Sequence, residues 1–250
     1  MSGGAIYVMW DRQVRQYLRN RQRLLTSLMQ PLLFLVAFGF GMGGMFEQAG
    51  NGSYLQYLIP GIVGMTILMS STMNGMSLIW DKQFGFLKET LVAPVSRTSL
   101  LFGRCLGGAS TSALQGVIVL VFGLMMGYQI TNLALLPVAF FAMFLVALLF
   151  NLFGTGIASK FDDMHSFPTI MNFLVMPLFF LSGALFPAEN FPGPIRLFIE
   201  INPFTYCVDL LKYGMNGAGA YNPLVDLSII GALIALLGAL GTYFFNRMET

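Results

Sequence analysis

The sequence predicts an all-α integral membrane protein with six transmembrane helices, and its composition and charge spacing are the observations behind this. Of the 250 residues, 56% are hydrophobic and only 10% are charged, whereas about a quarter of the residues in soluble domains are charged. The segment 105–159 contains no Asp, Glu, Lys, Arg or His. As one helix at about 1.5 Å per residue it would be roughly 80 Å long, although a bilayer core is about 30 Å thick. The chain must therefore fold back there, and we expect one membrane domain over residues 1–250.

Other stretches without charge also approach the ~20 residues that a membrane span requires. With polar ends trimmed, the six predicted spans are residues 24–45, 57–79, 105–126, 133–158, 167–186 and 224–245. The turn within the charge-free segment is predicted at 128–132, where polar and aromatic residues follow Gly127. Under this assignment no buried charge is expected inside a span.

The distribution of Lys and Arg predicts the orientation of these spans. Of the 13 Lys and Arg residues, all but Arg196 and Lys212 fall in the N-terminal segment, the second and fourth connections or the C-terminal tail. The positive-inside rule then places both termini in the cytoplasm, as in a multi-pass protein of the cytoplasmic (inner) membrane. Cys105 and Cys207 would lie on opposite sides of the membrane, which excludes a disulfide between them.

Residues 1–23 are predicted to form an amphipathic helix along the membrane interface. Its apolar residues share one side of a helical wheel and most of its basic residues share the other. The apolar residues are Ile6, Met9, Trp10, Val14, Tyr17 and Leu18, and the basic ones are Arg12, Arg15, Arg19 and Arg23. Such a helix can be a membrane anchor whose arginines meet lipid phosphates, or a docking site for a cytoplasmic partner.

Two connections carry patterns of their own. In the region 80–104, Phe84, Leu87 and Leu91 have helical spacing and Pro94 ends the pattern. This predicts a short amphipathic helix at the cytoplasmic mouth, either a binding element or a solvated linker. The region 187–223 is predicted to be external, and its two apolar pieces are too short to cross the membrane. We expect short helices there, at the outer leaflet or in a re-entrant hairpin.

Several motifs resemble those of one transporter family. Phe-Leu-Ser-Gly-Ala-Leu-Phe-Pro at 180–187 is followed by Ile-Asn-Pro-Phe-Thr-Tyr at 201–206 and Asp-Leu-Leu-Lys-Tyr-Gly at 209–214. Together these resemble the C-terminal signature of ABC-2 type exporter permeases, which include the daunorubicin-resistance and nodulation-factor export subunits. The run Phe-Leu-Lys-Glu-Thr-Leu-Val-Ala-Pro-Val-Ser-Arg at 86–97 resembles their coupling helix, and Lys-Phe-Asp-Asp at 160–163 resembles their second cytoplasmic loop.

The resemblance implies a homodimer of six-helix permeases resting on two copies of a separate nucleotide-binding ATPase subunit. The residues that would contact this ATPase are Phe84, Phe86, Leu87, Lys88, Glu89, Leu91, Asp162 and Asp163. The sequence has no G-x-x-x-x-G-K-[ST] loop, so we expect no enzyme activity and no cofactor in this chain, with ATP and Mg²⁺ held by the partner. The expected cargo is amphipathic or lipid-linked and is exported across the membrane; a drug, a glycolipid, a polysaccharide and a peptide all remain open.

The second predicted span offers a candidate substrate pathway. Methionines suit irregular apolar ligands, although the same stripe can pack against other helices. The candidate residues are Met65, Met69, Met73 and Asn74.

Two other functions remain as alternatives. An ion-coupled carrier is disfavoured because such carriers usually have charges inside the membrane. A membrane-embedded hydrolase would need a base beside Ser182, yet the single histidine, His165, is predicted on the opposite side. The net charge of +2 gives no reason to expect a nucleic-acid partner, and we expect no metal site around His165.

Overall fold

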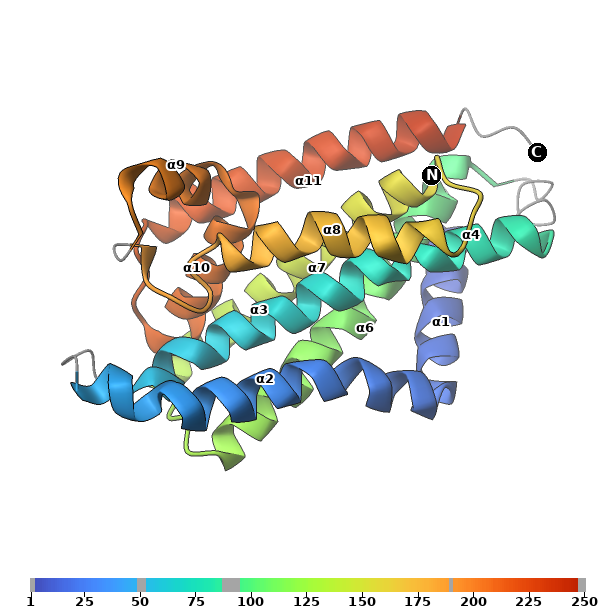
Figure 1. Cartoon of the computed structure of the whole chain (residues 1–250). Coiled ribbons are helices and arrows are strands. Elements are labelled where there is room, and N and C mark those ends of the chain that lie inside the picture. The colour runs from blue at the N-terminus through green and yellow to red at the C-terminus, as the bar shows by residue number, and fades with distance from the viewer. Residues whose placement is uncertain (1–2, 49–52, 87–94, 189–190, 247–250) are drawn as a thin grey trace.

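Long helices that run side by side make up most of the protein (Figure 1). The computed structural model describes residues 3–48, 53–86, 95–188 and 191–246. Every element of regular secondary structure in these ranges is a helix. The lengthwise helices are α2 (Arg21–Gln48), α3 (Tyr54–Asn74), α4 (Met76–Gln83), α6 (Arg97–Met125), α7 (Leu136–Ala158), α8 (Ser166–Phe180) and α11 (Pro223–Asn246). Helix α1 (Gly3–Arg19) crosses the bundle at one end, and both chain ends lie toward that same end (Figure 1).

Five helical segments among the described residues are long and apolar enough to cross a membrane. They are Leu24–Gly41, Tyr54–Gln83, Arg97–Met125, Leu133–Ala158 and Pro223–Phe245. They coincide with five of the six predicted spans, so the chain is an all-helical, multi-pass membrane protein.

The remaining predicted span, 167–186, has a shorter helix than expected. Helix α8 has 15 residues, about 22 Å at about 1.5 Å per residue, less than a bilayer core of about 30 Å. The apolar sequence continues, but Gly183 adopts a φ of 72° and turns the chain. A sixth crossing therefore stays a prediction.

The predicted hairpin between two spans is confirmed. Helix α6 ends at Met125, and Gly127 follows with a φ of 101°. The short helix η1 (Leu133–Leu135) leads into α7, and the Asn132 side chain accepts a hydrogen bond from the Ala134 amide at 3.0 Å. The polar turn thus lies where the sequence places it.

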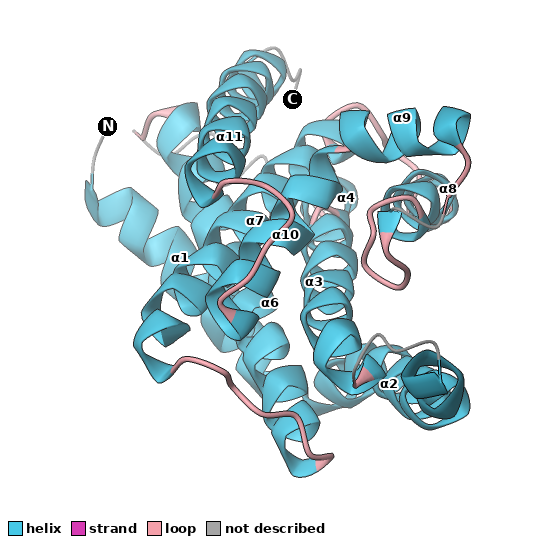
Figure 2. Cartoon of the chain, turned by 90° about the vertical axis from the view of Figure 1, so that its left-hand side faces the viewer, coloured by secondary structure: helices cyan, strands magenta, loops and turns pink. Residues whose placement is uncertain are grey.

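Helix α3 lies inside the bundle, against α2, α6, α7 and the shorter helix α10 (Pro203–Asn216) (Figure 2). Its closest approach to α7 is between backbones. A Cβ atom added at Gly154 would lie 2.5 Å from the Thr72 carbonyl oxygen, and one added at Gly75 would lie 2.4 Å from the Gly154 oxygen. Glycine is needed at this crossing because no larger residue fits without moving a helix.

The outer helices are much less buried than α3. In the most apolar 18-residue stretch of the segment Tyr54–Gln83, 67% of the residues are buried. In Leu24–Gly41 of α2 only 17% are buried. The exposed apolar residues of α2 recur every three or four positions: Leu25, Met29, Leu33, Val36 and Phe40. Spacing of this kind forms one stripe along the helix, which we call the α2 stripe. It provides an apolar surface for lipid or for another protein.

The two short helices predicted between the last spans are confirmed as α9 (Gly193–Ile201) and α10. Helix α10 is embedded in the bundle, with Phe204, Cys207 and Leu211 fully buried against neighbouring helices. Asn202 donates hydrogen bonds to the carbonyls of Leu178 and Leu181 and so links the start of α10 to the end of α8. This packing is what a re-entrant helix would need.

Helix α1 contacts protein over much of the face that was predicted to lie in lipid. Met9 and Tyr17 are buried, and the Trp10 indole donates a hydrogen bond to the Ser110 hydroxyl at 3.0 Å. At Gly103 of α6, an added Cβ would lie 2.8 Å from the Ile6 oxygen, so the two backbones approach closely. Leu18 stays exposed. The predicted amphipathic helix is present, but α6 covers part of its apolar side.

The prediction that no span contains a buried charge is wrong. Asp226 lies in the predicted span 224–245 and is buried. Asp81 and Arg104 lie just outside the predicted spans, but the apolar helical segments Tyr54–Gln83 and Arg97–Met125 extend further than predicted and include them, and both are buried. Asp81 and Arg104 neutralise each other as an ion pair, which lowers the cost of burying them. Asp226 lies in the first turn of α11. Hydropathy did not identify Asp81 and Arg104 as buried, because a charge bordering an apolar run normally marks the end of a span.

Candidate coupling site and adjoining pocket

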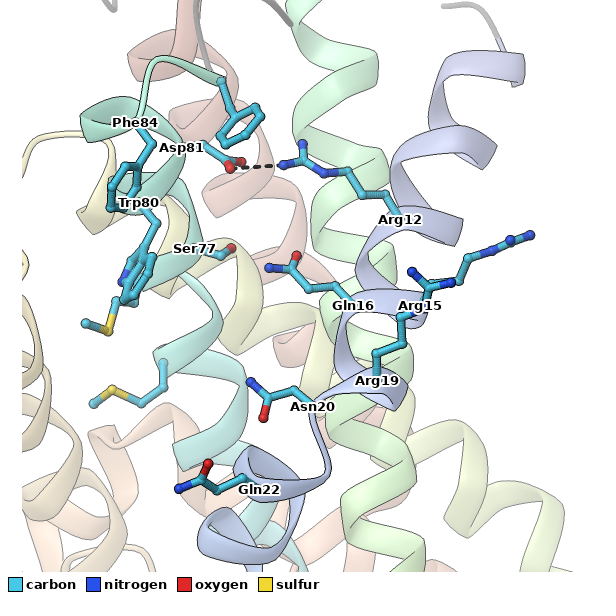
Figure 3. A pocket seen from close by; sticks show the side chains of 13 residues that line it. Arg12, Arg15, Gln16, Arg19, Asn20, Gln22, Ser77, Trp80, Asp81 and Phe84 are labelled. Atoms are coloured by element: carbon cyan, nitrogen blue, oxygen red, sulfur yellow. Dashed lines mark hydrogen bonds and ion pairs between the residues drawn. The ribbon is translucent and has the colours of Figure 1, made fainter.

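One carboxylate in α4 joins three helices. The Arg104 Nη2 of α6 donates to Asp81 Oδ2. The Arg12 Nη2 of α1 donates to Asp81 Oδ1 at 3.1 Å (Figure 3). Arg104 Nη1 also donates to the Ser77 hydroxyl at 3.3 Å. The Arg104 side chain is 5% exposed, whereas that of Arg12 is 38% exposed. Asp81 therefore makes a buried link to α6 and a weaker, solvent-accessible link to α1.

The next two residues of α4 connect it to the α7–α8 connection. Lys82 Nζ donates to the Ser159 oxygen at 2.7 Å and to the Phe161 oxygen at 3.2 Å. It also forms an ion pair with Asp162 at 3.2 Å, and the Gln83 amide donates to the Asp162 carbonyl at 2.7 Å. A lysine at these carbonyls is favourable because the C-terminal end of a helix carries partial negative charge.

The structure brings Asp162, but not Asp163, into contact with α4. Asp163 accepts hydrogen bonds from the His165 amide at 3.1 Å and from the Ser166 amide at 2.9 Å. The Ser166 hydroxyl is the main cause that lowers the pKa of the Asp163 carboxyl, followed by these amides. Asp163 thus stabilises the start of α8.

Two aromatic residues of the predicted coupling region are exposed at the end of α4. Phe84 is 64% exposed and Phe86 is 53% exposed. The expected single helix through Phe84, Leu87 and Leu91 is wrong at its start, because α4 ends at Gln83 and Gly85 has a φ of 80°. The other predicted contact residues, Leu87, Lys88, Glu89 and Leu91, lie outside the described residues.

A pocket of about 1130 Å³ adjoins this junction, between α1, the start of α2 and the α3–α4 helices (Figure 3). Its α1–α2 wall is polar and basic, with Arg12, Arg15, Gln16, Arg19, Asn20 and Gln22. Its opposite wall is mostly apolar, with Met73, Met76, Ser77, Trp80, Asp81, Phe84 and Phe86. We call these the basic wall and the apolar wall. The arrangement can bind a molecule that has both a charged and an apolar part.

The four candidate pathway residues occupy different environments. Met73 lines the pocket, whereas Met65 is fully buried in the core and Met69 is partly buried against that core. The Asn74 side chain donates to the Gly108 carbonyl and the Ser112 hydroxyl, each at 3.2 Å, and so joins α3 to α6. Only Met73 reaches the pocket.

The pocket and the junction contain residues that the sequence argument did not select. Asp81, Arg104 and Trp80 are central to them. Nothing in the sequence pattern links Asp81 to Arg104. Their separation of 23 residues gives no periodic signal. Ser182, the candidate nucleophile of the hydrolase alternative, instead donates to the Phe179 carbonyl at 2.7 Å. No group of three or more His, Cys, Asp or Glu suited to a metal ion occurs in the described part of the chain.

Comparison with known proteins agrees with this architecture. Residues 4–216 match the family described as ABC-2 type transporter. The ycf38 transport permease of Cyanophora paradoxa is 30% identical over 215 residues, which are 83% of this chain and 73% of that protein. The inner membrane transport permease YadH of Escherichia coli K12 is 26% identical over 94% of this chain and 91% of its own length. Nodulation protein J of Rhizobium leguminosarum bv. trifolii is 26% identical over 88% and 84% respectively. This multi-pass membrane protein belongs to the ABC-2 type transporter family of transport permeases.

Proposed function

We propose that the chain is the membrane-spanning subunit of an ATP-driven exporter in the cytoplasmic membrane, coupled to a separate ATP-binding subunit. Permeases of this family work with ATP-binding subunits. The observation that carries the proposal for this chain is the junction at α4. Asp81 and Lys82 fix this helix to α1, α6 and the α7–α8 connection, directly before the segment that resembles a coupling helix.

The junction supports a mechanism for transmitting movement. An ATP-binding subunit would contact Phe84, Phe86 and the following segment, and so displace α4. Because Asp81 is bonded to Arg104, the displacement reaches α6; because Lys82 is bonded to the end of α7, it also reaches that helix. These contacts favour movement of several helices as a unit.

A second copy of this chain completes the proposed transporter, together with two ATP-binding subunits. The α2 stripe supports this part of the proposal, since five large apolar side chains point out of the bundle along one helix. Phe173 of α8 is also 79% exposed. Two copies that pack through these helices would remove the apolar stripe from lipid and enclose a path between them.

The proposed cargo is amphipathic or lipid-linked. The support is the pocket beside the junction, where a basic wall faces an apolar one. Met73 is the residue of the predicted pathway that we propose as a cargo contact, because it lies on the apolar wall. Cargo bound there would be next to the helix that the ATP-binding subunit displaces.

The test measures ATP hydrolysis and efflux in the same vesicles. The chain is reconstituted with the ATP-binding subunit that co-purifies with it from the host, and efflux of a fluorescent amphipath is followed. We expect Lys82→Met to lower ATP-driven efflux at least about fivefold while ATP hydrolysis continues, because α4 loses its link to α7. Arg196→Gln is the control, since Arg196 and Glu200 form an exposed pair at 3.3 Å on α9.

Two results would contradict the proposal. Efflux that proceeds without ATP and without the ATP-binding subunit would indicate a carrier or a channel. Full coupling in Lys82→Met would show that the α4 junction does not transmit force.

A further inference from the structure

The pocket beside α4 has an excess of positive charge on its basic wall. Three arginines and one aspartate line it. The two Asp81 oxygens already bind Arg104 and Arg12, so the aspartate cannot neutralise the other two arginines. Arg15 pairs with Asp11, but the Arg15 side chain remains 70% exposed. Arg19 forms no ion pair with any residue in the described ranges. An anion is therefore the complementary ligand for this wall.

The apolar wall excludes a small hydrated anion as the whole ligand. Met73, Met76 and Trp80 lie on it within the apolar segment Tyr54–Gln83. Trp80 is 48% exposed although it is one of the largest apolar side chains of the chain. From residue 73 to residue 80 the helices rise about 10 Å, the length of several methylene groups. Bound phosphate alone would leave this surface in water, whereas a hydrocarbon chain would cover it.

The position of the pocket fits a ligand that arrives from the membrane. Helix α1 crosses the end of the lengthwise helices (Figure 1), as an amphipathic helix at the lipid headgroups does. Arg15, Gln16 and Arg19 of α1 line the pocket on the side opposite Trp80 and Phe84 (Figure 3). The charged wall is thus at headgroup level, and the apolar wall leads toward the hydrocarbon.

We propose that this pocket binds a lipid with a negatively charged phosphate headgroup. Arg15 and Arg19 bind the phosphate, and the start of an acyl or isoprenoid chain lies along Met73, Met76 and Trp80. The volume of about 1130 Å³ exceeds the range of about 300–1,000 Å³ typical of small-molecule pockets, so a headgroup and part of a chain can fit. The binding requires only the fold; that the lipid is also cargo rests on the proposed exporter function.

Trp80 provides a local probe for the test. The chain has two tryptophans, and Trp10→Phe leaves Trp80 as the only one. This variant is placed in phosphatidylcholine vesicles with a minor fraction of phosphatidylglycerol brominated near the headgroup end of its chains. Matched vesicles contain the bromine on an equal fraction of phosphatidylcholine instead. We expect Trp80 fluorescence to be quenched by brominated phosphatidylglycerol at about a fifth or less of the lipid fraction that brominated phosphatidylcholine needs.

Charge variants separate the pocket from general attraction of acidic lipid. In Arg15→Gln/Arg19→Gln, the preference for phosphatidylglycerol should disappear, because each nearby cation contributes about a factor of five and both are removed. Arg97→Gln/Lys160→Gln removes the same charge outside the pocket lining and should keep the preference. Equal quenching by the two lipids in the parent protein would overturn the proposal, and so would an equal loss in both double variants.

A second arm identifies the source of the lipid. ATP and the ATP-binding subunit are added to the parent vesicles. If the lipid is cargo, quenching falls during ATP hydrolysis; if it is a fixed lipid of the bilayer, quenching persists, and both results agree with the proposed ligand. Failure of the exporter proposal would appear as no ATP-dependent efflux with the lipid preference intact, so the two failures are distinguishable.

Discussion

Replacing Asp81 by Asn should destabilise the protein far more than replacing its exposed partner. The substitution leaves the Arg104 guanidinium, which is 5% exposed, without its counter-charge. Leaving one member of a buried ion pair alone costs about 3–5 kcal/mol. Arg12 is 38% exposed, and water can replace its contact with Asp81, so Arg12→Gln should cost about 0–1 kcal/mol. In Asp81→Asn/Arg104→Met no charge remains buried, and most of the loss should be recovered.

Thermal unfolding in detergent with a thiol-reactive dye can measure these differences. Cys105 and Cys207 are free and buried, so they react when the protein unfolds. For a chain of this size, 1 kcal/mol corresponds to about 2–4 °C in Tm. We expect Tm to fall by about 6–20 °C in Asp81→Asn and by less than about 4 °C in Arg12→Gln. The reasoning is refuted if the two single variants lose similar stability, or if the double variant loses the sum of the Asp81→Asn and Arg104→Met losses.

Three further predictions concern packing, burial and assembly. Gly154→Ala should lower the free energy of unfolding by about 1–3 kcal/mol, because the new methyl would lie 2.5 Å from the Thr72 oxygen. The control is Gly156→Ala on the same helix, where an added Cβ meets nothing within 4 Å, so this variant should be neutral or slightly stabilising. Thermal unfolding compares the two variants. Asp226→Asn should keep or raise stability because this buried carboxyl lies beside the Asp209 carboxylate and its oxygens accept no hydrogen bond from a described residue. Asp209→Asn should instead lose about 1–3 kcal/mol because Asp209 accepts from the Ala220 and Tyr221 amides at 2.7 and 2.9 Å. The opposite order would contradict this. Leu33→Cys on the α2 stripe should form a disulfide-linked dimer on oxidation in membranes, while Leu236→Cys, which is 55% exposed on α11, should not; equal crosslinking would argue against pairing through α2.

Hydropathy was sufficient to predict the five long helices and the turn between α6 and α7. A helix in lipid must satisfy its backbone hydrogen bonds within itself, so its length appears in the sequence as an uncharged run. The end of α8 was not predictable in this way, because residues 181–186 remain mostly apolar after the helix stops. The positive φ at Gly183, which turns the chain there, changes no hydropathy value.

Only the part of the candidate site that lies at the ends of the membrane spans was predictable from the sequence. Asp162 and α4 meet because both follow spans that finish at the same end of the bundle, and the family resemblance implied their shared role. The methionine stripe of α3 was ambiguous because this helix has neighbours on several sides. Periodicity identified the stripe, but tertiary packing determines that Met65 is enclosed in the core and that Met73 borders the pocket.

The near-continuous rod formed by α3 and α4 has a consequence for how distant regions communicate. Gly75 between them keeps a right-handed helical conformation, with φ −55° and ψ −31°, so the chain continues its helical path at this junction. Pro60 within α3 removes one backbone hydrogen bond of the rod. One end carries Lys82, while at the other end the Tyr54 hydroxyl donates to the Leu185 carbonyl and the Tyr57 hydroxyl donates to that of Gly183. The same pair of helices therefore joins the contacts of the lysine to the turn that leads to α9 and α10, and Pro60 is the position between them where the helix can bend.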